Sequence, residues 1–149
     1  MSQTMPTLPP EATAGVLTPR LFAYLIDICV IAVLMVMLFV IVTVLGALTF
    51  GLAWFLFPVV GAGTGVLYSM VTVGGSRQST IGMRMLGLRA VGPGGTPVDY
   101  VTAAVHALLF YVAASTGLVL MVDILVGLLR DDRRLLHDVL TGVTIVNAR

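Results

Sequence analysis

The sequence predicts an all-α membrane protein. Two full transmembrane helices are expected, with a third apolar stretch that forms a re-entrant or tilted helical hairpin. Of the 149 residues, 58% are hydrophobic and 10% are charged, and the mean hydropathy of +1.08 lies far above the usual range of soluble domains. Three long apolar segments alternate with short polar connections. All basic residues are arginines, and they gather in those connections.

The N-terminal region separates from the membrane domain by its composition. Residues 1–18 are rich in proline and predict a flexible tail, so the transmembrane domain is expected to comprise residues 19–149. Thr18 and Pro19 are typical of a helix start, with the threonine as N-cap and the proline in the first turn. The apolar segment 21–45 that follows exceeds the roughly 20 residues needed to span a bilayer.

A short uncharged connection leads to a second apolar segment, residues 52–73. The segment predicts an antiparallel second span with a kink at Pro58. Gly61 and Gly65 are four residues apart on one face, a spacing that lets two helix backbones approach closely. We expect this face to serve helix packing, either inside the chain or between copies of a homo-oligomer.

The third apolar segment, residues 101–129, is interrupted by polar residues at 115–117. Because arginines concentrate in cytoplasmic loops, the basic loop at 77–89 and the basic cluster at 130–134 should lie on one side of the membrane. They do so if the third segment turns near 115–117 and returns. A single tilted helix would instead place the second cluster outside. Arms of about 14 residues are too short to cross fully, which favours re-entrant or tilted helices.

The remaining elements are expected at the cytoplasmic face. Thr96, Pro97 and Asp99 are typical of a helix start capped by the threonine. Residues 86–91 precede a glycine-rich turn, and residues 143–146 are mostly β-branched, so the two segments predict a small two-stranded sheet. Residues 135–140 predict a short amphipathic helix between the basic cluster and the second strand.

Arg20 and Asp27 open the first span and share one helical face, about 10 Å apart along the axis. Helical side chains lean toward the N-terminus, so Arg20 should point away from Asp27. We therefore expect a base from another element beside Asp27, and the candidates are Arg84, Arg130, Arg133 and Arg134. A carboxylate at this depth forms a structural ion pair or handles an ion or a proton.

Other polar residues allow similar alternatives. Asp123 either forms a second buried carboxylate near Asp27 or hydrogen-bonds to a neighbouring helix. His106 is expected to be a core residue, and His106 and His137 lack the spacing of metal ligands, so no metal site is predicted. There is no catalytic constellation or phosphate loop, which predicts that the protein is not an enzyme and needs no cofactor. The net charge of +1 gives no reason to expect nucleic acid.

Three motifs together resemble the RDD family of bacterial membrane proteins, which is named for one arginine and two aspartates. They are Arg20 with Asp27, the loop at 80–91 before the glycine-rich turn, and the ending at 133–142 that contains Asp138. Arg20, Asp27 and Asp138 match the three named positions. Met83 stands where the family commonly has lysine, so a role for that lysine does not carry over.

The resemblance implies a multi-pass protein of the bacterial cytoplasmic (inner) membrane. The distribution of the arginines predicts that both termini lie in the cytoplasm. The resemblance further implies a transport-related role, with ion or proton exchange through buried carboxylates. The alternative is a non-catalytic accessory or scaffold subunit of a larger membrane complex. The expected partners are membrane lipids, whose headgroups the arginine clusters would contact, together with further copies of the chain or the subunits of such a complex.

Overall fold

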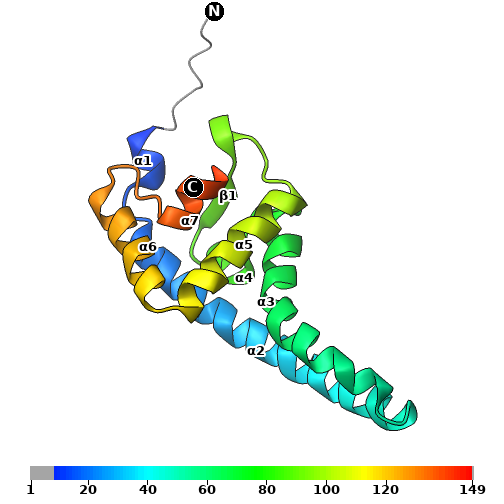
Figure 1. The fold of residues 1–149 in the computed structure, drawn as a ribbon. Helices are drawn as coiled ribbons and strands as arrows, with labels where there is room; N and C mark the ends of the chain where they lie inside the picture. The colour runs from blue at the N-terminus through cyan, green and yellow to red at the C-terminus, as the bar shows by residue number, and fades with distance from the viewer. Residues whose placement is uncertain (1–8, 149) are drawn as a thin grey trace, which may run out of the picture.

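The computed structural model describes residues 9–148 and confirms the predicted fold class (Figure 1). Two long helices form a hairpin, a bent helical pair packs beside it, and a two-stranded sheet lies at one end. The α-helices and strands are α1 Pro10–Thr13, α2 Leu17–Leu48, α3 Phe57–Val73, α4 Ile81–Met85, β1 Leu88–Val91, α5 Tyr100–Ser115, α6 Leu118–Leu129, α7 Leu136–Thr141 and β2 Thr144–Asn147. Two 3₁₀-helices, η1 Leu52–Leu56 and η2 Pro93–Gly95, lie in connections.

The α2–α3 hairpin projects beyond the other elements (Figure 1). With 32 residues, α2 is about 48 Å long and exceeds the thickness of the hydrocarbon core. Both Glu11–Leu48 and Leu52–Val73 are long and apolar enough to cross a membrane. The expected kink at Pro58 is wrong, because this proline lies in the first turn of α3, where its missing N–H breaks no helical bond.

Two predicted helix starts are also wrong. The N-cap of α2 is Val16, which is fully buried in the core, and Thr18 is already inside the helix. The prediction of a tail at 1–18 therefore fails from residue 10 onward, while residues 1–8 lie outside the described part of the chain. Asp99 rather than Thr96 caps α5, with its carboxylate accepting from the backbone N–H of Thr102 at 2.9 Å. A charged cap at this end suits the helix dipole.

The third apolar segment bends where the hairpin was expected to turn. The chain bends by 118° between α5 and α6, at a break formed by Thr116 and Gly117. With 16 and 12 residues, the two helices are about 24 and 18 Å long, so neither crosses a 30 Å core unaided. Helix α5 packs closely against Gly65 of α3, since an added Cβ there would lie 2.8 Å from the Tyr111 ring. At Gly61 such a Cβ would only reach Phe39 of α2, at 3.9 Å.

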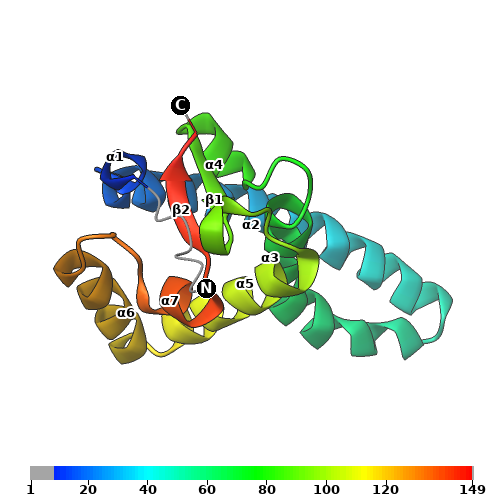
Figure 2. The same ribbon diagram turned by 90° about the horizontal axis from the view of Figure 1, so that it is seen from above.

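The sheet confirms the predicted strand pairing. Strands β1 and β2 are antiparallel, with Leu88 opposite Asn147 and Val91 opposite Thr144. Figure 2 shows the sheet beside α1 and α4, near the start of α2. Buried side chains from both strands meet residues from the start of α2 and from α4, and this cluster forms the hydrophobic core. The compact core therefore lies at the end of the bundle that carries the polar residues.

We predict that Gly82→Ala destabilises this core by about 1–3 kcal/mol, the usual cost of overpacking. A Cβ at Gly82 would lie 2.1 Å from the carbonyl oxygen of Ala23, a backbone atom of α2 that cannot rotate away. Unfolding in a denaturing-detergent titration measures the effect. Gly63→Ala is the matched control, because a Cβ there meets no atom within 4 Å. Equal stability of the two variants would contradict the close approach of α4 and α2.

Candidate functional site

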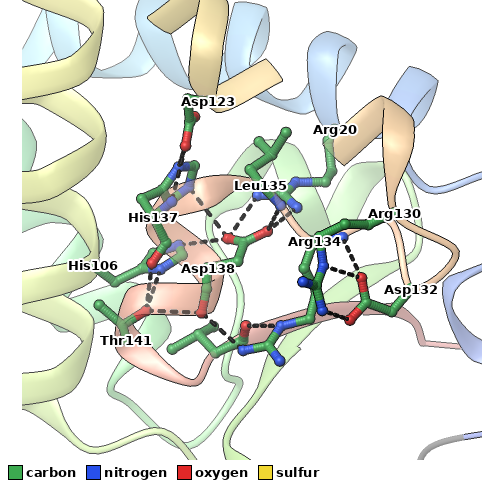
Figure 3. Close-up of polar contacts among 11 residues, drawn as sticks. Arg20, His106, Asp123, Arg130, Asp132, Arg134, Leu135, His137, Asp138 and Thr141 are labelled. Carbon is green, nitrogen blue, oxygen red and sulfur yellow. Dashed lines mark hydrogen bonds and ion pairs between the residues drawn. The ribbon is translucent and has the colours of Figure 1, made fainter. Parts of the chain in front are cut away.

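An ion pair joins the beginning of the chain to its end. Arg20, in the first turn of α2, donates from Nη1 to Oδ2 of Asp138 at 2.5 Å and from Nη2 to Oδ1 at 3.0 Å (Figure 3). The backbone N–H of Leu135 also donates to Oδ2, at 2.9 Å, so the aspartate closes the first turn of α7. A two-pronged arginine–carboxylate contact fixes both distance and orientation. It therefore clamps α7 onto α2.

The position of Asp138 also determines its charge. Its side chain is fully buried, and burial alone would raise the pKa of the carboxyl group. The Arg20 guanidinium outweighs burial and lowers the pKa from 3.8 to about 2. Because the folded pKa is the lower one, the stability that this pair contributes is present at neutral pH. It is lost only as the pH falls below about 4 toward 2.

Asp27 makes a separate set of contacts, in which all the donor groups are uncharged. Its Oδ1 accepts from the Tyr68 hydroxyl at 2.7 Å and from the backbone N–H of Gly82 at 2.8 Å, and its Oδ2 accepts from the Thr80 hydroxyl at 2.6 Å. We expected an arginine beside Asp27, and this prediction is wrong. Among the described residues, the carboxylate accepts from these uncharged donors instead. Asp27 therefore connects α2 to α3 and to the start of α4.

Asp123 of α6 holds His137 in place. The carboxylate accepts from the backbone N–H of His137 at 2.8 Å, and both of its oxygens lie within 2.9 Å of Nδ1 of the ring. Nε2 on the other side of the ring lies 3.2 Å from Oδ1 of Asp138. His137 thus stands between two buried carboxylates, one from α6 and one from its own helix (Figure 3).

His106 completes the cluster from α5. Its Nδ1 lies 3.1 Å from the Thr141 hydroxyl, and its Nε2 lies 3.6 Å from Oδ1 of Asp138. The two imidazole rings are neighbours, with centroids 4.7 Å apart. His106, His137 and Asp138 each offer one ligand atom, and these atoms lie within 4.8 Å of one another. The residues that could hold a metal ion are therefore brought together by folding, although their sequence spacing gave no such indication.

The two sets of polar contacts border one cavity of about 370 Å³. Asp27 and Thr80 line it from one set, and Arg20, His106, Asp123 and His137 line it from the other. The rest of the wall is largely apolar and aromatic, with Phe110 and Tyr111 among its residues. A cavity of this size can hold water or a small solute next to buried charged groups.

The residues of this site occupy a stretch that a known family model covers. The model of the RDD family matches residues 14–142, most of the chain. The chain belongs to the RDD family. No curated protein and no solved structure matches it.

The three residues for which the RDD family is named do not form one contact set here. Arg20 and Asp138 are in direct contact, although 118 positions separate them in sequence. Asp27 shares a helix with Arg20 but contacts α3 and α4 instead. Arg20 thus points away from Asp27, as the side-chain direction in helices requires.

The other arginines that we considered have local partners. Arg130 forms an exposed ion pair with Asp132 at 2.7 Å, and this contact raises the pKa of Arg130 and lowers that of Asp132. Arg134 donates to the backbone carbonyls of Val143 and Asp138, which fixes the loop before β2. Arg84 and Arg133 donate to the carbonyls of Thr80 and Leu128.

Sequence reasoning missed several members of the site. Tyr68, Thr80 and Thr141 were not singled out, and His137 was considered only as a metal ligand of unsuitable spacing. The available signal was polarity in an apolar context: Tyr68 lies in the second span, and His137 directly precedes Asp138. That signal shows that such a side chain needs a partner. It does not identify the partner, which comes from a distant segment.

We predict that Asp138→Asn lowers the free energy of unfolding by about 3–5 kcal/mol, because it leaves the Arg20 guanidinium without a counterion in a largely buried position. Thermal unfolding in detergent measures the change. Asp132→Asn is the matched control, since it removes the same charge from the exposed pair with Arg130 and should change stability much less. Similar losses in the two variants would contradict the clamp.

Proposed function

We propose that this RDD protein exchanges protons or small cations across the bacterial inner membrane. The observation that carries the proposal is the cavity between the helices, whose wall contains two buried aspartates, Asp27 and Asp123. Carboxylates inside a membrane protein are costly and commonly mark ion pathways. The match to the RDD family supports a membrane protein and leaves its activity to be tested.

In this proposal the aspartates that line the cavity handle the ion, and the ion pair between Arg20 and Asp138 has a structural role. Arg20 and Asp138 hold α2 and α7 together and so keep the cavity in shape. Asp27 presents one edge to the cavity while three donors hold it, which keeps a negative charge in place for a passing cation. The hydroxyls of Tyr68 and Thr80 can turn from Asp27 to a solute in the cavity.

One chain does not supply enough membrane-crossing helices to enclose a complete ion pathway. Helices α5 and α6 are each too short to cross the bilayer. A homo-oligomer would place the long α2–α3 hairpin of one copy beside the short helices of another. The proposal therefore includes assembly of several copies around the cavities.

The alternative is an accessory subunit of a larger membrane complex. The projecting part of the α2–α3 hairpin favours it, because this part extends past the other elements and its apolar side chains are largely exposed (Figure 1). Such a hairpin can pack against helices of another protein. Gentle detergent extraction distinguishes the two functions: a pure homo-oligomer supports transport, and a stable complex with another membrane protein supports the accessory function.

We predict that the purified protein in liposomes dissipates an imposed sodium or proton gradient, and that Asp27→Asn reduces the flux at least tenfold. The asparagine keeps the size of the side chain and removes its charge. Ala107→Leu tests the cavity itself, because Ala107 lines it and a larger side chain would fill it. A pH-sensitive dye inside the vesicles reports the flux.

Asp132→Asn is the control for this experiment, because its exposed carboxylate lies outside the cavity lining. It should transport at the rate of the unmodified protein. Each variant is first checked for a folded, monodisperse state by size exclusion. Absence of flux from folded wild-type protein, or full flux from folded Asp27→Asn, would contradict the transport function.

We also propose that both termini lie in the cytoplasm and that the basic loops contact anionic lipid headgroups there. The side-chain amide of Asn147 donates to the backbone carbonyl of Ala14 at 3.1 Å, which supports a common side for the two ends. Arginine-rich loops at that end follow the charge bias of cytoplasmic segments.

We predict that a cysteine at position 148 reacts with a membrane-impermeant maleimide only after the inner membrane is opened. The variant is Ala148→Cys in a Cys29→Ala background, because Cys29 is itself exposed. A cysteine at position 50, at the tip of the α2–α3 hairpin, should react from the periplasm in intact spheroplasts. The reverse pattern would invert the proposed orientation.

A further inference from the structure

Two histidines, His106 of α5 and His137 of α7, face the carboxylate of Asp138, which is also on α7 (Figure 3). Nε2 of His137 and Nε2 of His106 lie 3.2 and 3.6 Å from Oδ1 of Asp138. His137 and Asp138 are buried, and His106 is mostly buried. Neither the proposed transport nor the clamp between α2 and α7 explains why two imidazoles face the same carboxylate oxygen.

In each ring, the hydrogen bond made by Nδ1 determines whether Nε2 carries a hydrogen or a lone pair. Nδ1 of His137 faces the carboxylate of Asp123, which only accepts, so this nitrogen donates. The Thr141 hydroxyl donates its hydrogen to the backbone carbonyl of His137 at 2.9 Å, so its oxygen accepts from Nδ1 of His106. In a neutral ring with its hydrogen on Nδ1, Nε2 carries a lone pair. Both lone pairs are therefore directed at a carboxylate oxygen.

Of these three acceptors, Oδ1 of Asp138 accepts from Nη2 of Arg20 at 3.0 Å. The two Nε2 lone pairs of the neutral rings face that oxygen without a donor of their own, which is unfavourable in a buried position and favours a cation between them. The charges indicate the same need. When both rings are neutral, the cluster contains the carboxylates of Asp123 and Asp138 and one compensating cation, Arg20. Arg134 approaches the backbone carbonyl of Asp138 rather than its carboxylate. One negative charge thus remains for an additional cation to balance.

We propose that His106 Nε2, His137 Nε2 and Asp138 Oδ1 form a binding site for a divalent transition-metal ion of the Zn²⁺ class. Two imidazoles and one carboxylate suit such ions, whereas Ca²⁺ and Mg²⁺ prefer oxygen ligands alone. Tetrahedral bonds to Zn²⁺ of about 2.0–2.2 Å set ligand atoms about 3.3–3.6 Å apart. The observed 3.2 and 3.6 Å agree with that spacing. All three ligand atoms lie within 4.8 Å of one another, so the two nitrogens would move closer together when the ion binds.

The groups behind the ligands are those that orient metal-binding residues. A ligating histidine usually donates its other N–H to a carboxylate, a carbonyl or another acceptor. Asp123 accepts in this way from His137, and Thr141 accepts from His106. Arg20 donates to both oxygens of Asp138, and the backbone N–H of Leu135 donates to Oδ2, which fixes the carboxylate with Oδ1 facing the rings. Both histidines also line the cavity, which gives the fourth coordination position access to water or another ligand.

The test uses the full-length protein in detergent, carrying a tag without histidines and treated with a chelator that is then removed. Co²⁺ serves as the spectroscopic probe, and Zn²⁺ is titrated calorimetrically and by displacement of Co²⁺. One equivalent of Co²⁺ should give the visible absorption of a tetrahedral site. His106→Ala and His137→Ala should each weaken Zn²⁺ binding at least 100-fold.

Two further variants distinguish a metal site from general destabilisation. Thr141→Val leaves all three ligands in place and removes the acceptor of His106, so it should retain the Co²⁺ spectrum with roughly 10-fold weaker binding. Asp132→Asn, outside the cluster, should bind as the unmodified protein does. If His106→Ala fails to fold, the Thr141→Val titration decides in its place.

Three results would overturn the site. They are failure of the folded wild-type protein to bind one equivalent of Zn²⁺, unchanged binding in His106→Ala, and unchanged binding in Thr141→Val. The first result would mean that a shared proton alone satisfies the three acceptors. Because binding is measured at equilibrium without a gradient, these results are independent of whether the protein transports ions.

Discussion

The ion pair between Arg20 and Asp138 is the constraint on which the polar end of the protein depends. It joins the first turn of the longest helix to a short helix near the end of the chain. With Asp138 fixed, its neighbour His137 reaches Asp123, and the His106 ring lies against the same carboxylate. Loss of this contact would detach α7 from α2 and leave it held through the contacts of His137 with Asp123 and of Thr141 with His106.

The arrangement separates two environments within a small protein. The projecting α2–α3 hairpin is apolar and largely exposed, as suits contact with lipid or with other helices. The opposite end contains the sheet, the short helices and the charged groups, packed around a compact core. Helices α5 and α6 are short and joined by a sharp bend, and their polar residues His106 and Asp123 contact α7. Asp123 of α6 and Asp27 of α2 both line the cavity.

Much of the fold followed from local patterns. Apolar segments of sufficient length indicated the two spans, the polar break at 115–117 indicated the bend, and the β-branched run at 143–146 indicated the second strand. Helix boundaries were less accurate. Thr18 and Thr96 have good capping chemistry, yet Val16 and Asp99 begin the helices. Packing of Val16 into the core and the stronger acceptor of Asp99 outweighed those local preferences.

The sequence by itself determined that the protein is a membrane protein, which segments are long and apolar enough to span a membrane, and where the third apolar segment bends. Its motifs also singled out Arg20, Asp27 and Asp138 through their resemblance to the RDD family. Length, hydropathy and helical periodicity are local properties, so they can be read along the chain. Only the tertiary structure decided that Arg20 contacts Asp138, that uncharged donors surround Asp27, and that two histidines converge on one carboxylate. Those contacts join residues as far apart as 118 positions, and the packing of whole helices, rather than any local preference, brings them together.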